Sequence, residues 1–174
     1  KLKGPIQAWC EALSAQSERP QIVSPESIQD ALMLISELPP RTRVVVVGGD
    51  GTLNQMLPAL LQGDHEVGLV PCGSGNDCAR AWGLNSMSWQ QALAHALYAT
   101  SSAIDLGRIE LNKKAIYYFH SSLAVGFDAS VGHRALTGPK FLSGLPRYLL
   151  ATFRELTNLK NWPLKLEVDG LLTH

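Results

Sequence analysis

Hydrophobic residues in the first hundred positions follow two kinds of spacing. Arg43–Val47 is rich in β-branched residues without alternation, which predicts a central strand buried on both faces, and Val67–Val70 predicts the next strand. Helical spacing surrounds these strands, and the predicted helices are residues 5–15, 25–38, 52–62, 79–82 and 89–98. Strands and helices in this order predict an α/β fold, a parallel sheet with helices on both faces.

Local signals refine the boundaries of these elements. Ser24 is the predicted N-cap of the second helix, with Pro25 in its first turn, and Ser88 is the predicted cap of the last. Residues 21–23 predict a short strand. Pro58 lies inside the pattern of helix 52–62, so we expect it to kink or shorten that helix.

The pattern changes near Ser101. Residues 103–109 and 115–124 predict two strands joined by a turn at 112–114. A helix over 145–159, a strand over 163–168 and a hairpin turn at Asp169-Gly170 follow. The chain stops at His174 before the returning strand is complete, so we expect a β-rich second domain that opens near residue 103 and is cut short.

Composition narrows the class of protein. The 174 residues are 45% hydrophobic and 17% charged, which is typical of a globular chain and excludes intrinsic disorder. No run of about 18 apolar residues predicts a transmembrane segment. Three cysteines without a disulfide framework indicate a reducing compartment, and we expect a cytoplasmic protein.

Charge is unevenly distributed although the net charge is zero. Residues 1–103 carry six Lys/Arg and nine Asp/Glu, whereas residues 104–174 carry nine and six. This bias is too weak for a nucleic-acid-binding protein. Ordinary solvated surface is the preferred interpretation, and a basic half that faces anionic lipid headgroups is the alternative.

The clearest chemical signal is the segment Gly48-Gly49-Asp50-Gly51-Thr52. It follows a predicted buried strand and precedes a helix, so its glycines allow a sharp turn and the helix N-terminus favours phosphate. A carboxylate in that position would repel phosphate, so the natural partner of Asp50 is Mg²⁺ or water on Mg²⁺. The alternative is a tight turn in which Asp50 serves only as a helix cap.

A second segment, Gly73-Ser74-Gly75-Asn76-Asp77, follows the next parallel strand. Ligands of open α/β sheets bind at this edge, so we expect the two loops and their aspartates to meet at one crevice. Asn76 either reads an adenine or ribose edge or holds the loop by side-chain hydrogen bonds. Neither a Walker P-loop nor a dinucleotide fingerprint is present.

Four segments together resemble the catalytic domain of diacylglycerol kinases, a family that includes sphingosine and ceramide kinases. They are VVVVGGDGTLN (Val44–Asn54), VPCGSGNDCAR (Val70–Arg80), IDLG (Ile104–Gly107) and VGFDA (Val125–Ala129). The likeness extends over nearly the whole chain. GGDG alone also occurs in NAD kinases and phosphofructokinases, whereas its combination with GSGNDxAR is specific.

The resemblance implies an ATP-binding α/β domain over residues 1–102 and the start of a β-sandwich domain over 103–174. It implies ATP and Mg²⁺ as cofactors, a lipid substrate at a membrane surface and peripheral association with that membrane. Asp50 would be catalytic, either through the Mg²⁺ network or on the lipid hydroxyl, and Asp77 would reach the metal through water. Arg80 would pair with a phosphate or form a surface salt bridge. The other implied nucleotide-binding residues are Gly48, Gly49, Gly51, Thr52, Asn54, Gly73, Ser74, Gly75 and Asn76.

The chain departs from the family pattern in three places. The first strand of the family is missing, Gln55 replaces the usual Glu, and Asp169-Gly170 is followed by Leu171, so it is not the D-G-E motif of the catalytic base. We therefore expect this chain to transfer phosphate inefficiently by itself. A kinase of a soluble substrate, similar to NAD kinase, and a catalytically silent regulatory module are the alternatives. The lipid, the nucleotide preference, a homodimer and a site role for His120 all stay open.

Overall fold

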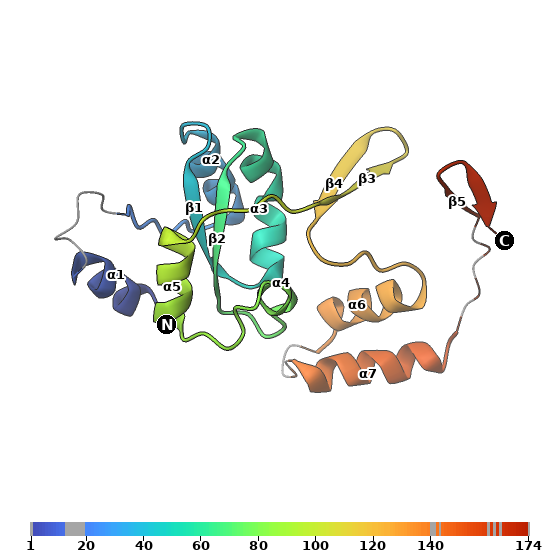
Figure 1. Cartoon of the computed structure of the whole chain (residues 1–174). Helices are drawn as coiled ribbons and strands as arrows, with labels where there is room; N and C mark the ends of the chain where they lie inside the picture. Colours follow the sequence, from blue (N-terminus) through green and yellow to red (C-terminus); the bar gives the residue numbers. More distant parts are fainter. Residues whose placement is uncertain are drawn as a thin grey trace. The chain divides into compact units, whose positions relative to one another are not determined.

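The computed structural model describes residues 2–12, 20–139, 142, 144–159, 161, 163 and 165–173. They belong to two compact units, Lys1–Ser121 and Ser122–His174, which are described separately (Figure 1). The helices of the first unit are α1 (Lys3–Ala12), α2 (Ile28–Ser36), α3 (Asp50–Gln62), α4 (Asp77–Ala81) and α5 (Trp89–Tyr98). No helix within the described ranges is long and apolar enough to cross a membrane.

The centre of the first unit is a parallel pair of strands, β1 (Arg43–Gly48) and β2 (Glu66–Pro71). α3 connects them, so the predicted parallel sheet is confirmed, although it has only two strands in the described chain. The Arg43 guanidinium links the start of β1 to β2 and to α5. It donates to the Glu66 carboxylate at 2.9 and 2.6 Å and to the carbonyl of Leu97, in α5, at 2.6 Å.

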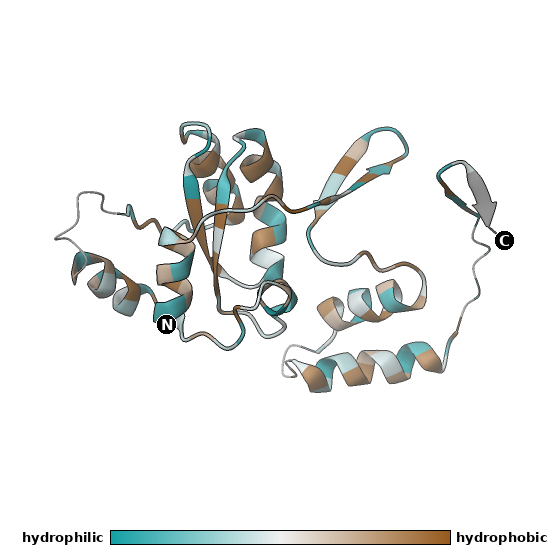
Figure 2. Cartoon of the chain, in the orientation of Figure 1, coloured by the Kyte–Doolittle hydropathy of each residue, from teal (hydrophilic) through white to brown (hydrophobic). Residues whose placement is uncertain are grey.

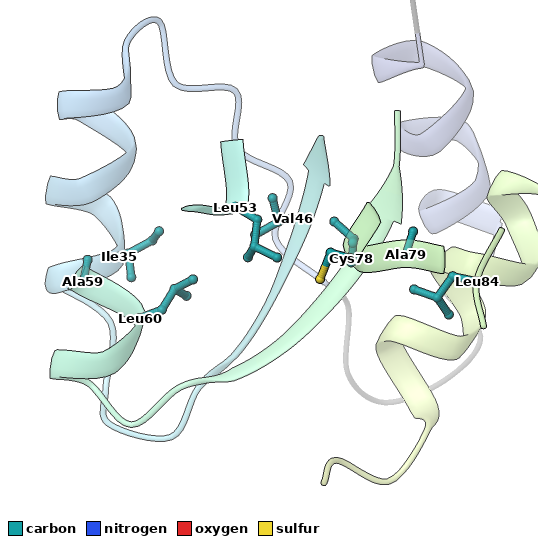
Figure 3. Packing of buried hydrophobic residues seen from close by; sticks show 9 residues of the cluster. Ile35, Val46, Leu53, Ala59, Leu60, Cys78, Ala79 and Leu84 are labelled. Atoms are coloured by element: carbon teal, nitrogen blue, oxygen red, sulfur yellow. The ribbon is translucent and has the colours of Figure 1, made fainter. Parts of the chain in front are cut away.

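Successive side chains of the two strands point to opposite faces of the sheet, and each face has its own hydrophobic cluster. Val46 and Leu69 belong to a cluster with residues of α2, α3 and α4 (Figure 3). Val45 and Val70 belong to a second cluster, with residues of α1 and α5. Helices therefore cover both faces, as the sequence pattern predicts. Val47 is nevertheless 43% exposed, so the expectation that all of β1 is buried on both faces is wrong.

The caps of the helices agree with the sequence in one case and correct it in another. Ser88 caps α5 as predicted, in a capping box with Gln91. α2 begins at Ile28, and its cap is Ser27, whose hydroxyl accepts from the N–H of Asp30. The prediction of Ser24 as the cap was therefore wrong, because the chain is still irregular there.

One further prediction for this unit is wrong, and another is corrected in part. Residues 21–23 form no strand. α3 runs from Asp50 to Gln62 without interruption, so Pro58 does not shorten it, and a kink at Pro58 stays a prediction. The end of the predicted helix 5–15 lies partly outside the described residues, since α1 is described to Ala12.

An antiparallel hairpin closes the first unit. Its strands, β3 (Gly107–Leu111) and β4 (Ala115–Phe119), are shorter than predicted, and its turn contains Asn112 and Lys113 at positive φ angles of 51° and 55°. A Cβ on Gly107 would meet the Phe119 ring at 2.0 Å, so the aromatic side chain lies across the glycine. β4 packs against α3, which brings the residue after β4, His120, to the start of that helix.

The second unit contains two packed helices, α6 (Phe127–Thr137) and α7 (Leu145–Leu156), and a short hairpin, β5 (Leu166–Val168) and β6 (Leu171–Thr173). Val131 of α6 and Ala151 of α7 are buried, and Arg134 pairs with Glu155 between the helices. Hydrophobic and hydrophilic residues alternate along α7 (Figure 2).

The sequence predicted α7 but not α6. The described part of residues 103–174 holds two hairpins and two helices, and the expected β-sandwich is not confirmed. The domain boundary at residues 102/103 stays a prediction, because compact units defined by contacts need not coincide with domains of a longer fold.

Candidate functional site

The first glycine-rich loop connects β1 directly to α3. Gly48 is still in the parallel ladder opposite Pro71, and its carbonyl accepts from the N–H of Cys72 at 2.9 Å. Gly49 precedes the helix, and its carbonyl accepts from the N–H groups of Thr52 at 3.0 Å and Leu53 at 3.1 Å. The loop is therefore a tight turn from strand to helix, at the carboxyl edge of the sheet.

The two glycine-rich loops touch each other through their backbones. A Cβ added to Gly49 would lie 2.8 Å from the Cα of Gly73, and a Cβ added to Gly73 would lie 2.7 Å from the Cα of Gly49. Real Cβ atoms essentially never come this close to a backbone atom. The glycines are thus required by close approach rather than by an unusual φ angle, and the meeting of the loops that the sequence predicts is present.

Asn76 shapes the second loop. Its Oδ1 accepts from the N–H of Gly73 at 2.9 Å and its Nδ2 donates to the carbonyl of Gly73 at 2.8 Å. The residue has a positive φ of 54°, a conformation that asparagine tolerates better than most residues. Of the two roles expected for Asn76, the structure shows the one in which its amide holds the loop.

Asp50 joins the first loop to the second. Its Oδ2 accepts from the N–H of Asp77 at 3.0 Å and its Oδ1 accepts from the N–H of Cys78 at 2.9 Å. These are the first two amides of α4, and the residue before them, Asn76, supplies no side-chain cap. The carboxylate of Asp50 therefore caps a helix other than its own, across the interface between the loops.

The same contacts set the charge state of Asp50. Burial raises the pKa of this carboxyl, but the hydrogen bonds from Cys78 and Asp77, together with the charge of His120, outweigh burial and lower the pKa below its ordinary value. Asp50 is therefore held as an anion. The neighbouring Cys78 thiol shows the opposite effect, since burial and the negative charge of Asp50 raise its pKa to about 11.

Asp77 lies on the exposed side of the same junction. Its carboxylate pairs with Arg80 one turn along α4, and both side chains are more than half exposed. Of the two roles expected for Arg80, the structure therefore shows the surface salt bridge. A Cβ on Gly75 would lie 3.3 Å from the Oδ2 of Asp50 and 3.9 Å from the Oδ2 of Asp77, so both carboxylates lie against one loop residue.

The remaining predicted site residues lie at the start of α3 and in the second loop. The side chain of Thr52 lies against Gly48, where an added Cβ would be 2.9 Å from it. Gly51, Ser74 and Gly75 are exposed, and their backbone N–H groups donate to no other group in the described chain. Asn54 is half-buried in α3.

Two features of the junction go beyond the sequence analysis, one that it missed and one that it left open. One is the amide of Cys78, which no sequence signal identifies, because every residue except proline carries a backbone N–H. The other is His120, whose ring contacts the backbone of Asp50. A cavity of about 700 Å³ is lined by residues from Arg41, β2 and His120, but no residue of the glycine loops lines it.

Asp50 and Asp77 supply the two carboxylates at the junction that could bind a metal ion. No cluster of three or more His, Cys, Asp and Glu side chains occurs among the residues that the structure describes. Mg²⁺ does not need such a cluster, because it binds through one or two carboxylates together with substrate phosphates and water. Each oxygen of Asp50 accepts one amide and keeps further lone pairs, so the donor set fits Mg²⁺ in complex with a nucleotide.

Comparison with known proteins agrees with this geometry. Over 127 residues, 73% of this chain and 41% of the relative, the chain is 35% identical to a diacylglycerol kinase of Mycobacterium tuberculosis (strain CDC 1551 / Oshkosh). It is 33% identical to a probable lipid kinase YegS-like of Shewanella frigidimarina, over 73% of the chain and 41% of the relative. It is 30% identical to the putative lipid kinase YtlR of Bacillus subtilis, over 56% of this chain and 32% of the relative.

The chain thus spans about two fifths of the length of these first two relatives. No solved structure matches it. The family model of the diacylglycerol kinase catalytic domain matches residues 3–109, a range that contains both glycine loops and is more than half of the chain. The chain therefore belongs to the diacylglycerol kinase catalytic domain family.

Proposed function

We propose that this chain is the nucleotide-binding part of an ATP- and Mg²⁺-dependent lipid kinase that transfers the γ-phosphoryl group to a hydroxyl of diacylglycerol or a related lipid. The observation that carries the proposal is the junction of the two glycine loops, where the Asp50 carboxylate is hydrogen-bonded to Asp77 and Cys78. Family membership supports kinase chemistry at this junction.

The exposed backbone amides would bind the nucleotide. The N–H groups of Gly51, Ser74 and Gly75 donate to nothing else in the described chain, and Gly75 lies against the two carboxylates. Backbone amides at a strand-to-helix turn bind phosphate oxygens well. Gly48, Gly49, Thr52, Asn54, Gly73 and Asn76 would shape this cradle, and Arg80 would exchange Asp77 for a phosphate when nucleotide binds.

Asp50 and Asp77 would hold the magnesium ion. The metal, when bound, would neutralise charge on the transferred phosphoryl group. Asp50 contributes a fixed carboxylate, because two amides restrain it and keep it ionised. Asp77 contributes a carboxylate that is open to solvent, since 64% of its side chain is exposed. Catalysis would then depend chiefly on positioning and charge neutralisation, which suits phosphoryl transfer.

We also propose that the full-length protein works at the surface of a membrane on its cytoplasmic side. The excess of Lys and Arg in residues 104–174 supports attraction to anionic headgroups, at most about 1 kcal/mol for each residue near the surface. Whether the protein forms a homodimer stays open.

The proposal is tested by phosphate transfer from γ-labelled ATP to diacylglycerol in detergent micelles, with the full-length protein. We expect label in the organic phase, and a loss of about 100-fold or more in Asp50→Asn. Asp64→Asn is the matched control, because Asp64 is 78% exposed, pairs only with Arg41 in the described chain, and has a positive φ that asparagine accepts. We expect this control to keep full activity.

Three outcomes would contradict the proposal. Label in the aqueous phase when soluble acceptors are supplied would indicate a kinase similar to NAD kinase. ATP binding without turnover would indicate a silent regulatory module. Full activity of Asp50→Asn would remove the catalytic role of the loop junction.

A further inference from the structure

His120 is the first residue after β4, and its imidazole reaches the beginning of α3. The ring Nε2 lies 3.3 Å from the backbone carbonyl oxygen of Asp50. A carbonyl oxygen can only accept, so Nε2 carries the hydrogen and donates it. The other ring nitrogen, Nδ1, is buried and has no hydrogen-bond partner among the described residues. Among the described residues, the imidazole of His120 therefore forms its hydrogen bond with the carbonyl of Asp50.

Asp50 is consequently held from two directions. Its carboxylate is bound by the amides of Asp77 and Cys78, which belong to α4. Its carbonyl accepts from His120, which follows the hairpin directly. The two contacts restrain both ends of the residue, and β4 itself packs against α3. Because the Asp50 carbonyl is also held, the Asp50 side chain should keep its direction better when the second glycine loop moves.

We infer that His120 is a positioning residue for Asp50, which fixes the first peptide of α3 by donating a hydrogen bond to it and thereby sets the direction of the Asp50 carboxylate. The inference rests on the proposed function for its effect on catalysis, whereas the contact and its effect on the loops do not depend on that function. His120 itself touches none of the reacting groups in this account.

Two substitutions separate the donated hydrogen bond from the volume of the ring. Glutamine in His120→Gln places an amide N–H at about the reach of Nε2, whereas leucine in His120→Leu has a similar size and no donor. His95 is the matched control position, because it is an exposed histidine on α5, a helix that packs on β1 and β2. Its variants are His95→Gln and His95→Leu.

Amide hydrogen exchange tests the inference without any assay of activity. The amides of Asp77 and Cys78 report whether the Asp50 carboxylate stays in place, and amides of β1 and β2 report global unfolding. In the full-length protein we expect His120→Leu to accelerate exchange at Asp77 and Cys78 by roughly three- to ten-fold relative to the strand amides. We expect His120→Gln and both His95 variants to exchange as the wild type does.

Several results would overturn the inference. One is unchanged exchange at Asp77 and Cys78 in His120→Leu. Another is equal acceleration in His120→Leu and His120→Gln, because that would assign the effect to packing of the ring. A third is acceleration in His120→Leu that extends equally to the strand amides, which would make the ring a general stabilising group.

Steady-state kinetics then tests the catalytic consequence. We expect His120→Leu to lower kcat for lipid phosphorylation by roughly ten-fold with little change in the KM for ATP, and His120→Gln to restore most of kcat. If the wild-type protein transfers no phosphate, the proposed function fails while the exchange result still stands. Equal kcat values for the leucine and glutamine variants in an active enzyme would overturn the positioning role.

Discussion

At the scale of single residues, the molecule is organised around Asp50. The sequence marks this residue by its three neighbouring glycines, and two interpretations were open, a magnesium ligand and a helix cap. The structure shows a cap, but of α4 rather than of its own helix. A carboxylate in this arrangement keeps lone pairs for a metal, so the structural role and the proposed catalytic role are compatible.

The capping role predicts how stability depends on pH. The pKa of Asp50 is lowered in the folded protein, so its ionised carboxylate stabilises the fold above the unfolded pKa of about 3.9, and this contribution disappears as pH falls through the folded value. The difference in unfolding free energy between the wild type and Asp50→Asn should therefore shrink as pH falls from about 6 to about 3, as measured by urea unfolding.

Ser88→Ala provides the control for this titration. Ser88 also caps a helix, but its partner in the capping box is Gln91, which does not ionise. Its difference from the wild type should stay constant over the same pH range. A difference for Asp50→Asn that is constant or grows toward acid would contradict the role assigned to the carboxylate.

At this scale the sequence could predict which residue types gather, but not the contacts among them. The glycines at 49 and 73 and the aspartates at 50 and 77 were expected at one sheet edge, and the structure brings them there. The bond from the amide of Cys78 was beyond prediction, because backbone groups carry no sequence signature. The contact of His120 depends on how the hairpin packs on α3, which is a tertiary property.

At the scale of elements, the sequence predicts a strand or a helix cap well only where neighbouring residues alone determine it. Ser88 and Gln91 have the spacing of a capping box and form one in the structure. The helix does not begin at the Ser24-Pro25 signal, because Ser27 and Asp30 form a capping box that starts α2 three residues later. Residues 21–23 form no strand, because β-branched residues need a neighbouring strand to pair with. α6 was missed because Gly132 and several polar residues weaken its helical pattern.

Replacement of the two serines tests the corrected start of α2. Ser27→Ala removes the acceptor for the Asp30 amide and should lower the free energy of unfolding by about 1 kcal/mol. Ser24→Ala should change it by less than about 0.5 kcal/mol, since position 24 lies outside the helix. Chemical denaturation of both variants decides the matter. The reverse order of effects would restore Ser24 as the cap.

At the scale of the whole molecule, family membership is established, and activity remains the proposal. The family model matches residues 3–109, and the chain spans only about two fifths of the length of the diacylglycerol kinase that it resembles. The α/β part could be predicted because alternating strands and helices leave few topologies. The expected β-sandwich is not confirmed, because the described residues after 121 form two helices and one short hairpin.

The central claim is that the contact between Gly49 and Gly73 builds a site for Mg·ATP. Isothermal titration calorimetry of the full-length protein tests it most directly, with Gly73→Ala as the variant, since the added Cβ would lie 2.7 Å from the Cα of Gly49. Gly132→Ala in α6 is the control, because its added Cβ meets no atom within 4 Å. We predict that the wild type and Gly132→Ala bind Mg·ATP equally and that Gly73→Ala binds at least about ten-fold more weakly. Wild-type affinity in Gly73→Ala, or no binding of Mg·ATP by the wild type, would contradict the account.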